Sequence, residues 1–380
     1  MQKFESLYIV FVLLLFFVEC RKPYTPAALT KADNYLVVDG FINTAANGVS
    51  TIVLSRTKNL TDTVVSMPET GASVGIVNES NVGFALQEST TPGTYVSNSL
   101  NLDKNGKHIL LITTAAGKNY QSDIVTVKQT PAIDSVTFHQ DNLGLNLFVN
   151  THDPLNNTRY YRWEYVQTWE YHSQLETPWG ISNGLVYART PDQQVHVCYT
   201  TTPSNHIIIG TSAALAQDVI SNQLLNSFSQ GDSTLWYRSS FLVKQYALTP
   251  QAYSYWQIIQ KNSEQLGTLF DLQPSQLTGN IHSLTDANEP VIGYITATNE
   301  QQQRIFINFS DLQGWSRGNG SYNCLVINYP TNATNFLLVD YPDPTYGPYY
   351  YVTNGPLKLA KNVCLDCTLS GGVTTKPSFW

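Results

Sequence analysis

The sequence predicts a mainly β protein with a few helices, in which an N-terminal immunoglobulin-like or transthyretin-like β-sandwich precedes a larger, β-rich α+β domain. Two observations predict this class. The 380 residues include 23 tyrosines and 7 tryptophans but only 13% charged residues, and aromatic side chains fit the pleated surface of a sheet. Short strand-like segments are also separated by glycine, proline or asparagine, the pattern of strands joined by turns.

The first 19 residues are typical of a lipoprotein signal peptide. The apolar run from Leu7 to Val18 is twelve residues long, whereas a membrane-spanning helix needs about 20, so the run fits a signal peptide. Cys20 follows directly, and we predict cleavage before it and lipidation of its thiol, with residues 20–34 as a tether. The alternative is an ordinary secretory peptide with an incidental cysteine. The predicted location is the cell outer membrane, with a lipid anchor.

Residues 35–128 are predicted to form the β-sandwich and residues 132–380 the second domain. Seven strand-like segments follow one another in the first of these, as in a small antiparallel sandwich. They are 35–42, 49–56, 72–77, 83–90, 93–99, 108–114 and 120–127.

The strongest strand signal of the second domain lies in residues 158–172. Its odd positions carry aromatic side chains: Tyr161, Trp163, Tyr165, Trp169 and Tyr171. Such alternation predicts a strand with one aromatic face. That face is either core, as expected for the largest apolar side chains, or a platform for a ligand, which makes Trp163 and Trp169 candidate binding residues.

One helix is predicted near residues 250–266. Thr249 can cap its N-terminus, Pro250 suits its first turn, and Gly267 stands where a helix would end. Residues 212–225 give a weaker helical signal.

Four cysteines remain once Cys20 carries lipid. They are Cys198, Cys324, Cys364 and Cys367. In the oxidising compartment implied by the signal peptide, an even number predicts two disulfides, with three possible connectivities, that staple the C-terminal tail. A four-cysteine zinc site and free or redox-active thiols are the alternatives. We predict no metal and no cofactor.

A tyrosine-rich stretch, DYPDPTYGPYYYVTNG, occupies residues 340–355. Its three prolines exclude a regular strand throughout, and its rings are candidate contacts to a partner because exposed tyrosines give contact area at low entropic cost. The alternative is that they cover the core of their own domain. The rings belong to Tyr341, Tyr346, Tyr349, Tyr350 and Tyr351.

The chain contains no GxSxG, HExxH or Walker motif, and it is therefore predicted to be non-enzymatic. The net charge of −7, with no basic stripe, argues against nucleic acid as a partner.

Several segments of the sequence resemble those of one known family. RYYRWEYVQTWEYHS, FLVKQYALTPQAYSYWQIIQKNSEQLG, EPVIGYITA and CLDCTLSGGVTTKPSFW are similar to the Bacteroidota lipoproteins grouped as domain of unknown function 4249. The resemblance implies lipid anchoring and a gene neighbour that encodes a TonB-dependent outer-membrane transporter, but no catalytic residue. Arg21, Lys22 and Pro23 follow Cys20, where surface-exported lipoproteins of this phylum often carry acidic residues.

Three hypotheses for the function follow. The first is an outer-membrane lipoprotein that helps a TonB-dependent transporter by capturing ligand or capping the transporter. The second is an envelope hydrolase acting on glycan or peptide, which a deep pocket with two carboxyls about 5–10 Å apart would support. The third is a structural or adhesive envelope protein.

Overall fold

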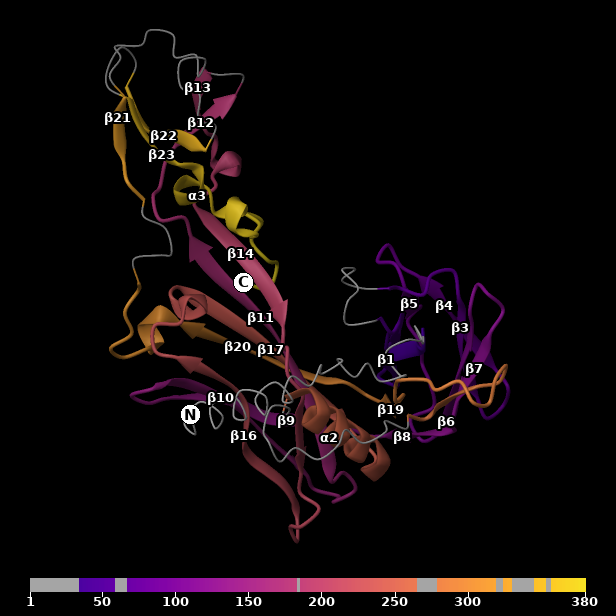
Figure 1. The fold of residues 1–380 in the computed structure, drawn as a ribbon. Helices are drawn as coiled ribbons and strands as arrows, with labels where there is room; N and C mark the ends of the chain where they lie inside the picture. The colour runs from indigo at the N-terminus through magenta and orange to yellow at the C-terminus, as the bar shows by residue number, and fades with distance from the viewer. Residues whose placement is uncertain are drawn as a thin grey trace, which may run out of the picture.

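The computed structural model describes residues 34–58, 67–182, 185–264, 279–318, 324–329, 345–352 and 357–380. These residues are mainly β, as the sequence predicts, with several sheets and two α-helices. Figure 1 shows an N-terminal unit of short strands and a second unit that rises beside it as a long arm. Among the described residues, no helix combines the length and the apolar character needed to cross a membrane.

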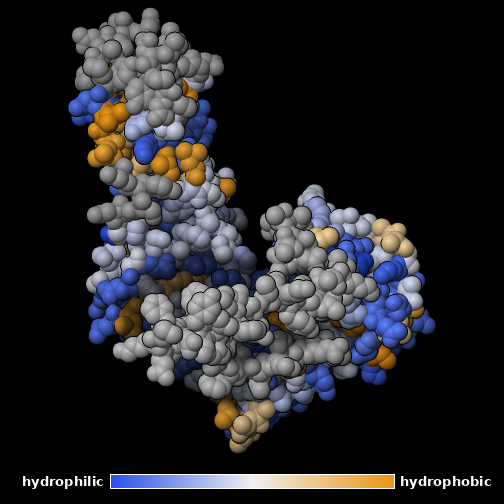
Figure 2. Space-filling view, viewed as in Figure 1, coloured by the Kyte–Doolittle hydropathy of each residue, from blue (hydrophilic) through white to orange (hydrophobic). Residues whose placement is uncertain are grey.

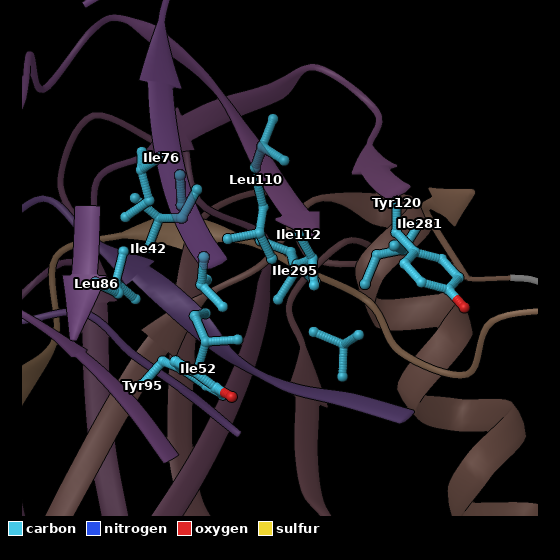
Figure 3. Packing of buried hydrophobic residues seen from close by; sticks show 14 of the residues in the cluster. Ile42, Ile52, Ile76, Leu86, Tyr95, Leu110, Ile112, Tyr120, Ile281 and Ile295 are labelled. Carbon is cyan, nitrogen blue, oxygen red and sulfur yellow. The ribbon is translucent and has the colours of Figure 1, made fainter. Parts of the chain in front are cut away.

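The N-terminal unit is a set of short, mainly antiparallel strands around one apolar core. All seven segments predicted from the sequence overlap these strands, and the last segment contains two of them. Ile42, Ile52, Ile76 and Leu110 have no exposed surface and point toward one another in Figure 3. The strands are β1 (Leu36–Asn43), β2 (Thr51–Arg56), β3 (Ser73–Asn78), β4 (Gly83–Glu88), β5 (Thr94–Ser97), β6 (Lys107–Thr113), β7 (Asn119–Ser122) and β8 (Val125–Lys128).

Two strands from much later in the chain complete this unit. β18 (Ile281–Ser283) pairs with β7, and β19 (Ala297–Thr298) lies parallel between β1 and β8. Because β8 also pairs with β6, the hydrogen-bonded strands form a closed circuit in the order β6-β3-β4-β5-β2-β1-β19-β8. Ile281 and Ile295 enter the same core as the early strands (Figure 3).

Residues 279–298 therefore belong to the N-terminal core, whereas the sequence analysis placed them in the second domain. The side chain of Glu289 reinforces this connection, since it accepts hydrogen bonds from Lys118 (3.0 Å) and Tyr120 (2.9 Å). Burial alone would raise the pKa of Glu289, but these two hydrogen bonds outweigh it and lower the pKa below its ordinary value. β18 and β19 contain three and two residues, too few for a periodic pattern to reveal them.

The second unit contains two sheets whose inner faces share one core. Buried side chains from both sheets, such as Leu147, Trp163 and Phe241, contribute to it. One sheet has the order β16-β10-β9, and the other β14-β11-β17-β20 with β15 beside β11. The strands are β9 (Ile133–Gln140), β10 (Gly144–Asp153), β11 (Tyr160–His172), β14 (Val197–Pro203), β15 (Ile208–Thr211), β16 (Asp218–Ser229), β17 (Arg238–Ala247) and β20 (Gln301–Asn308).

The predicted helix is present as α2 (Pro250–Glu264). Thr249 caps it as expected, because its side-chain oxygen accepts the backbone N–H of Ala252 (3.1 Å). The weaker helix predicted over residues 212–225 is wrong. β16 occupies much of that segment and pairs along β10, where burial of Ile220 and Leu225 in the shared core outweighs local helical propensity.

A small lobe, here called the tip, closes the far end of the arm (Figure 1). The tip consists of β12 (Trp179–Ser182), β13 (Leu185–Ala188), β21 (Ile327–Tyr329), β22 (Tyr346–Tyr351), β23 (Leu357–Lys361) and α3 (Asn362–Leu365). Its own small core includes Leu357, Leu359 and Leu365, each at most 3% exposed.

The C-terminal tail returns from the tip along the arm. A short 3-10 turn, η6 (Cys367–Ser370), is followed by a two-way backbone contact between Val373 and Tyr199 of β14. Trp380 then packs edge-on against Tyr199 and Phe306. The tail is thus held against the five-stranded sheet.

Two disulfides fix this arrangement, as the sequence predicts. Cys198 of β14 is bonded to Cys367 of η6, and Cys324 to Cys364 of α3. Since all four thiols are paired with one another, the alternatives of a zinc site and of free thiols do not apply to them. Within the described residues there is also no group of three or more potential metal ligands.

Candidate functional site

The aromatic face of β11 runs from the core into an open pocket. Trp163 is fully buried and donates its indole N–H to Gln245 (2.7 Å). Trp169 and Tyr171 lie further along the same face, because side chains on one face repeat every second residue, and they line a cavity of about 330 Å³. Trp163 is therefore a core residue, and the prediction that it contacts a ligand is wrong, whereas Trp169 lies at the candidate site.

Three further rings complete the walls of this cavity, here called the aromatic pocket. His172 follows Tyr171 on β11, while Trp236 and Tyr237 directly precede β17. These three residues were not among the site residues predicted from the sequence. The adjacent Trp-Tyr pair before a strand was a local signal, but only the pairing of β11 with β17 brings it to Trp169.

The ring walls are held in place by their neighbours. The hydroxyl of Tyr171 donates to the carbonyl of Cys367 (2.6 Å), next to the disulfide. Tyr237 stacks on His172, with ring centres 3.7 Å apart, and also faces the guanidinium of Arg317 at 4.4 Å. Trp236 donates its indole N–H to the carbonyl of Gly231 (2.8 Å). Walls fixed in this way reduce the entropy lost when a ligand binds.

A serine and a histidine meet at the rim of the aromatic pocket. Ser173 Oγ lies 2.9 Å from His196 Nδ1 and donates its proton to the carbonyl of Leu175 (2.9 Å). Because a hydroxyl has one proton to donate, Ser173 accepts from His196, which is the reverse of what activation of a nucleophile requires. Burial, reinforced by nearby His172, lowers the pKa of His196 and keeps it neutral near pH 7. The pair therefore shapes the loop after β11.

Few carboxylates line three cavities among the described residues. The aromatic pocket is lined by none, the tip cavity of about 320 Å³ by Asp366, and a cavity of about 220 Å³ beside α2 by Asp123. Glycoside hydrolysis of the usual kind needs two carboxyls in one site. The lining of the aromatic pocket consists mainly of rings, among them the imidazole of His172, together with hydroxyls and an amide.

The tyrosine-rich stretch contributes to the tip, where β22 is a strand with a shift of register between Pro348 and Tyr350. Tyr346 is half-buried and lines the tip cavity together with Trp179. Tyr349 is half-buried, whereas Tyr350 is 46% exposed. Among the three tyrosines of this stretch whose side chains the structure describes, Tyr350 is thus the most exposed.

Some predicted site residues lie outside the described residues. Cys20 and Tyr341 are among them, as is the side chain of Tyr351.

Fold and site together define a two-unit β protein with a disulfide-stapled arm and an aromatic pocket on that arm. Residues 21–304 match the model of the family described as Domain of unknown function (DUF4249), and the chain belongs to this family. The match ends within β20, so β21, β22 and β23 of the tip lie beyond it. A comparison with curated proteins gives no match.

Proposed function

We propose that this protein is a non-enzymatic lipoprotein of the outer membrane of a Bacteroidota bacterium. It would act as an accessory of a TonB-dependent transporter, capturing ligand or capping the transporter, with the tip as the contact surface. The apolar run of residues 7–18, which is followed by Cys20, supports the lipid anchor. The family resemblance supports the choice of partner.

The observation that carries the proposal is the apolar surface of the tip. Figure 2 shows hydrophobic residues gathered on the upper part of the arm. Monomeric soluble proteins rarely expose contiguous apolar patches of large size, and such patches commonly mark protein contacts. The exposed large hydrophobic side chains among the described residues of the tip and its flanks are Tyr187 (37%), Leu325 (64%), Val326 (38%), Tyr350 (46%), Val352 (41%) and Leu369 (59%).

The tip is built to present this surface rigidly. The disulfide from Cys324 to Cys364 fastens the segment before β21 to α3, and Thr177 donates to the carbonyl of Pro348 (2.8 Å) across the tip. A rigid surface loses little entropy on docking. Lipid anchoring in the membrane of the transporter would also raise the effective concentration of the two partners, so that a modest patch suffices.

The N-terminal unit would serve as a structural spacer between the tether and the arm. We infer for it the immunoglobulin-like or transthyretin-like sandwich class, a class that carries no activity of its own. Its short, mainly antiparallel strands around one apolar core support this inference.

The test is recovery of the transporter from native membranes, with full-length tagged protein as bait after mild cross-linking. The variant Tyr350→Ser with Val352→Ser removes two exposed apolar side chains of the tip. The matched control is Leu143→Ser with Leu155→Ser, because these leucines are 84% and 75% exposed at turns flanking β10. All three proteins should unfold at similar temperatures.

We expect the tip variant to recover at least about tenfold less transporter, which corresponds to about 1.4 kcal/mol, while the control recovers as much as wild type. Equal recovery by the tip variant and wild type would place the contact elsewhere. If wild type recovers no TonB-dependent transporter, the proposed partner is wrong.

A further inference from the structure

Among the described residues, the lining of the aromatic pocket contains no Asp, Glu, Lys or Arg side chain. Two charged groups beside the pocket are already engaged. The carboxylate of Glu170 lies 2.8 Å from His172 Nε2. The guanidinium of Arg317 donates to the carbonyl of Trp236 (2.7 Å) and faces the ring of Tyr237 at 4.4 Å. A charged ligand would leave water without gaining a free opposite charge, at a considerable cost in free energy, so the lining favours an uncharged ligand.

Neutral hydrogen-bonding groups surround the rings and are available to a ligand. Within the part of the chain that the structure describes, five of them have no hydrogen-bond partner in the protein. They are the indole N–H of Trp169, the amide of Gln174 and the hydroxyls of Thr200, Ser233 and Ser370. A purely hydrocarbon ligand would displace water from these groups without replacing its hydrogen bonds, which costs affinity. The ligand should therefore carry several hydroxyl groups as well as an apolar face.

The ring walls suit such an amphipathic, hydroxylated ligand. The face of an aromatic ring is the negative part of its quadrupole, and the C–H groups on one face of a pyranose are weakly positive. A sugar ring can thus lie against Trp169 or Trp236 while its equatorial hydroxyls reach the polar rim. The cavity of about 330 Å³ is near the lower end of the size of small-molecule sites, about 300–1,000 Å³, which suits one or two sugar rings.

We propose that the aromatic pocket binds a neutral saccharide of one or two hexose units, free or as part of a glycan. Stacking on Trp169 and Trp236 supplies the apolar contact. Gln174, Thr200 and Ser370 supply hydrogen bonds to the sugar hydroxyls. This site adjoins the tip through Val363 of α3 and Ser370 of η6, but it contains neither Tyr350 nor Val352 and does not depend on the identity of the partner that docks on the tip surface.

The test uses the full-length protein without its signal peptide and an array of neutral gluco-, manno- and galacto-oligosaccharides, with oligogalacturonate and indole as charged and apolar probes. Hits are measured by calorimetry and by intrinsic fluorescence, because Trp169 and Trp236 both line the site. Trp169→Ala removes the stacking ring, and Trp169→Phe restores a ring without the N–H. The matched control is Trp256→Ala, since Trp256 is also half-buried but lies on α2 against Arg162.

We expect at least one neutral saccharide to bind. Trp169→Ala should weaken that binding at least about tenfold, Trp169→Phe should restore part of it, and Trp256→Ala should leave it unchanged. The proposal is overturned if no neutral saccharide binds at millimolar concentration, if only oligogalacturonate or indole binds, or if Trp169→Ala binds as well as wild type. The tip variant Tyr350→Ser with Val352→Ser should bind the saccharide normally, so failure at one site is distinguishable from failure at the other.

Discussion

Removal of the two disulfides one at a time tests how the arm is held together. The bond from Cys198 to Cys367 joins β14 to the tail across 169 residues of sequence, whereas the bond from Cys324 to Cys364 spans 40. The perturbations are Cys198→Ala with Cys367→Ala, and Cys324→Ala with Cys364→Ala. Each double change removes one cross-link and leaves the other.

The two bonds should differ in their contribution to stability. The loop-entropy relation gives about 5 kcal/mol for the longer loop and about 4 kcal/mol for the shorter one, a difference of about 1.3 kcal/mol. Side-chain packing should also make the loss of stability larger for the Cys198–Cys367 bond. Cys198 and Cys367 are at most 1% exposed, while Cys324 is half-buried, so alanines at 198 and 367 also leave small cavities.

Urea unfolding followed by tryptophan fluorescence measures this difference. All seven tryptophans lie from residue 163 onward and outside residues 279–298, so the signal reports the second unit. We expect both double variants to be destabilised, the one without the Cys198–Cys367 bond more strongly. Fully reduced wild type should be the least stable sample. Equal stability of the two variants, or a larger loss without the Cys324–Cys364 bond, would refute the reasoning from loop length and burial.

Four further predictions concern single residues. Cys20→Ala should release the protein from membranes or leave its precursor uncleaved; an unmodified mature N-terminus at another residue, found by mass spectrometry of wild type, would contradict lipidation. Trp163→Ala should cost about 3–5 kcal/mol of unfolding free energy, as expected for a fully buried ring. Trp169→Ala should cost no more than about 1 kcal/mol. If urea titration gives similar losses for the two variants, both tryptophans are core residues. Burial lowers the pKa of His108 in the folded state. As the pH drops below about 6.5, this histidine is therefore protonated more readily in the unfolded state, and the free energy of unfolding falls. His108→Gln should lessen that loss between pH 7 and about 5, and an unchanged pH profile of stability would exclude His108 as its cause. Because the pKa of Glu289 is lowered in the fold, its ionised carboxylate stabilises the folded state above about pH 4.3, and this stabilisation is lost as the pH falls further. Glu289→Gln should therefore cost about 1–3 kcal/mol of unfolding free energy at pH 7 and little at low pH. A cost that does not change with pH would show that the charge of Glu289 is unimportant.

The sequence by itself determined the features that depend on neighbouring residues. Alternation within residues 158–172 was enough to predict β11, because side chains on a strand repeat with period two. Thr249 and Pro250 were enough to locate the start of α2, because a helix cap is a local hydrogen bond. An even set of four cysteines after a predicted signal peptide was enough to predict two disulfides, though not which cysteines pair.

The tertiary structure decided the features that depend on distant parts of the chain. Residues 279–298 complete the N-terminal core through strands too short to carry a pattern, and residues 218–229 form a strand because β10 lies beside them. Trp163 and Trp169 occupy equivalent positions in one alternating pattern, yet one is core and the other lines a pocket. The opposing sheet covers Trp163, while Trp236, Tyr237 and the tail leave an open cavity at Trp169. Alternation specifies the face of a strand on which a side chain lies, but the elements packed on that face determine whether the side chain is buried or available to a ligand.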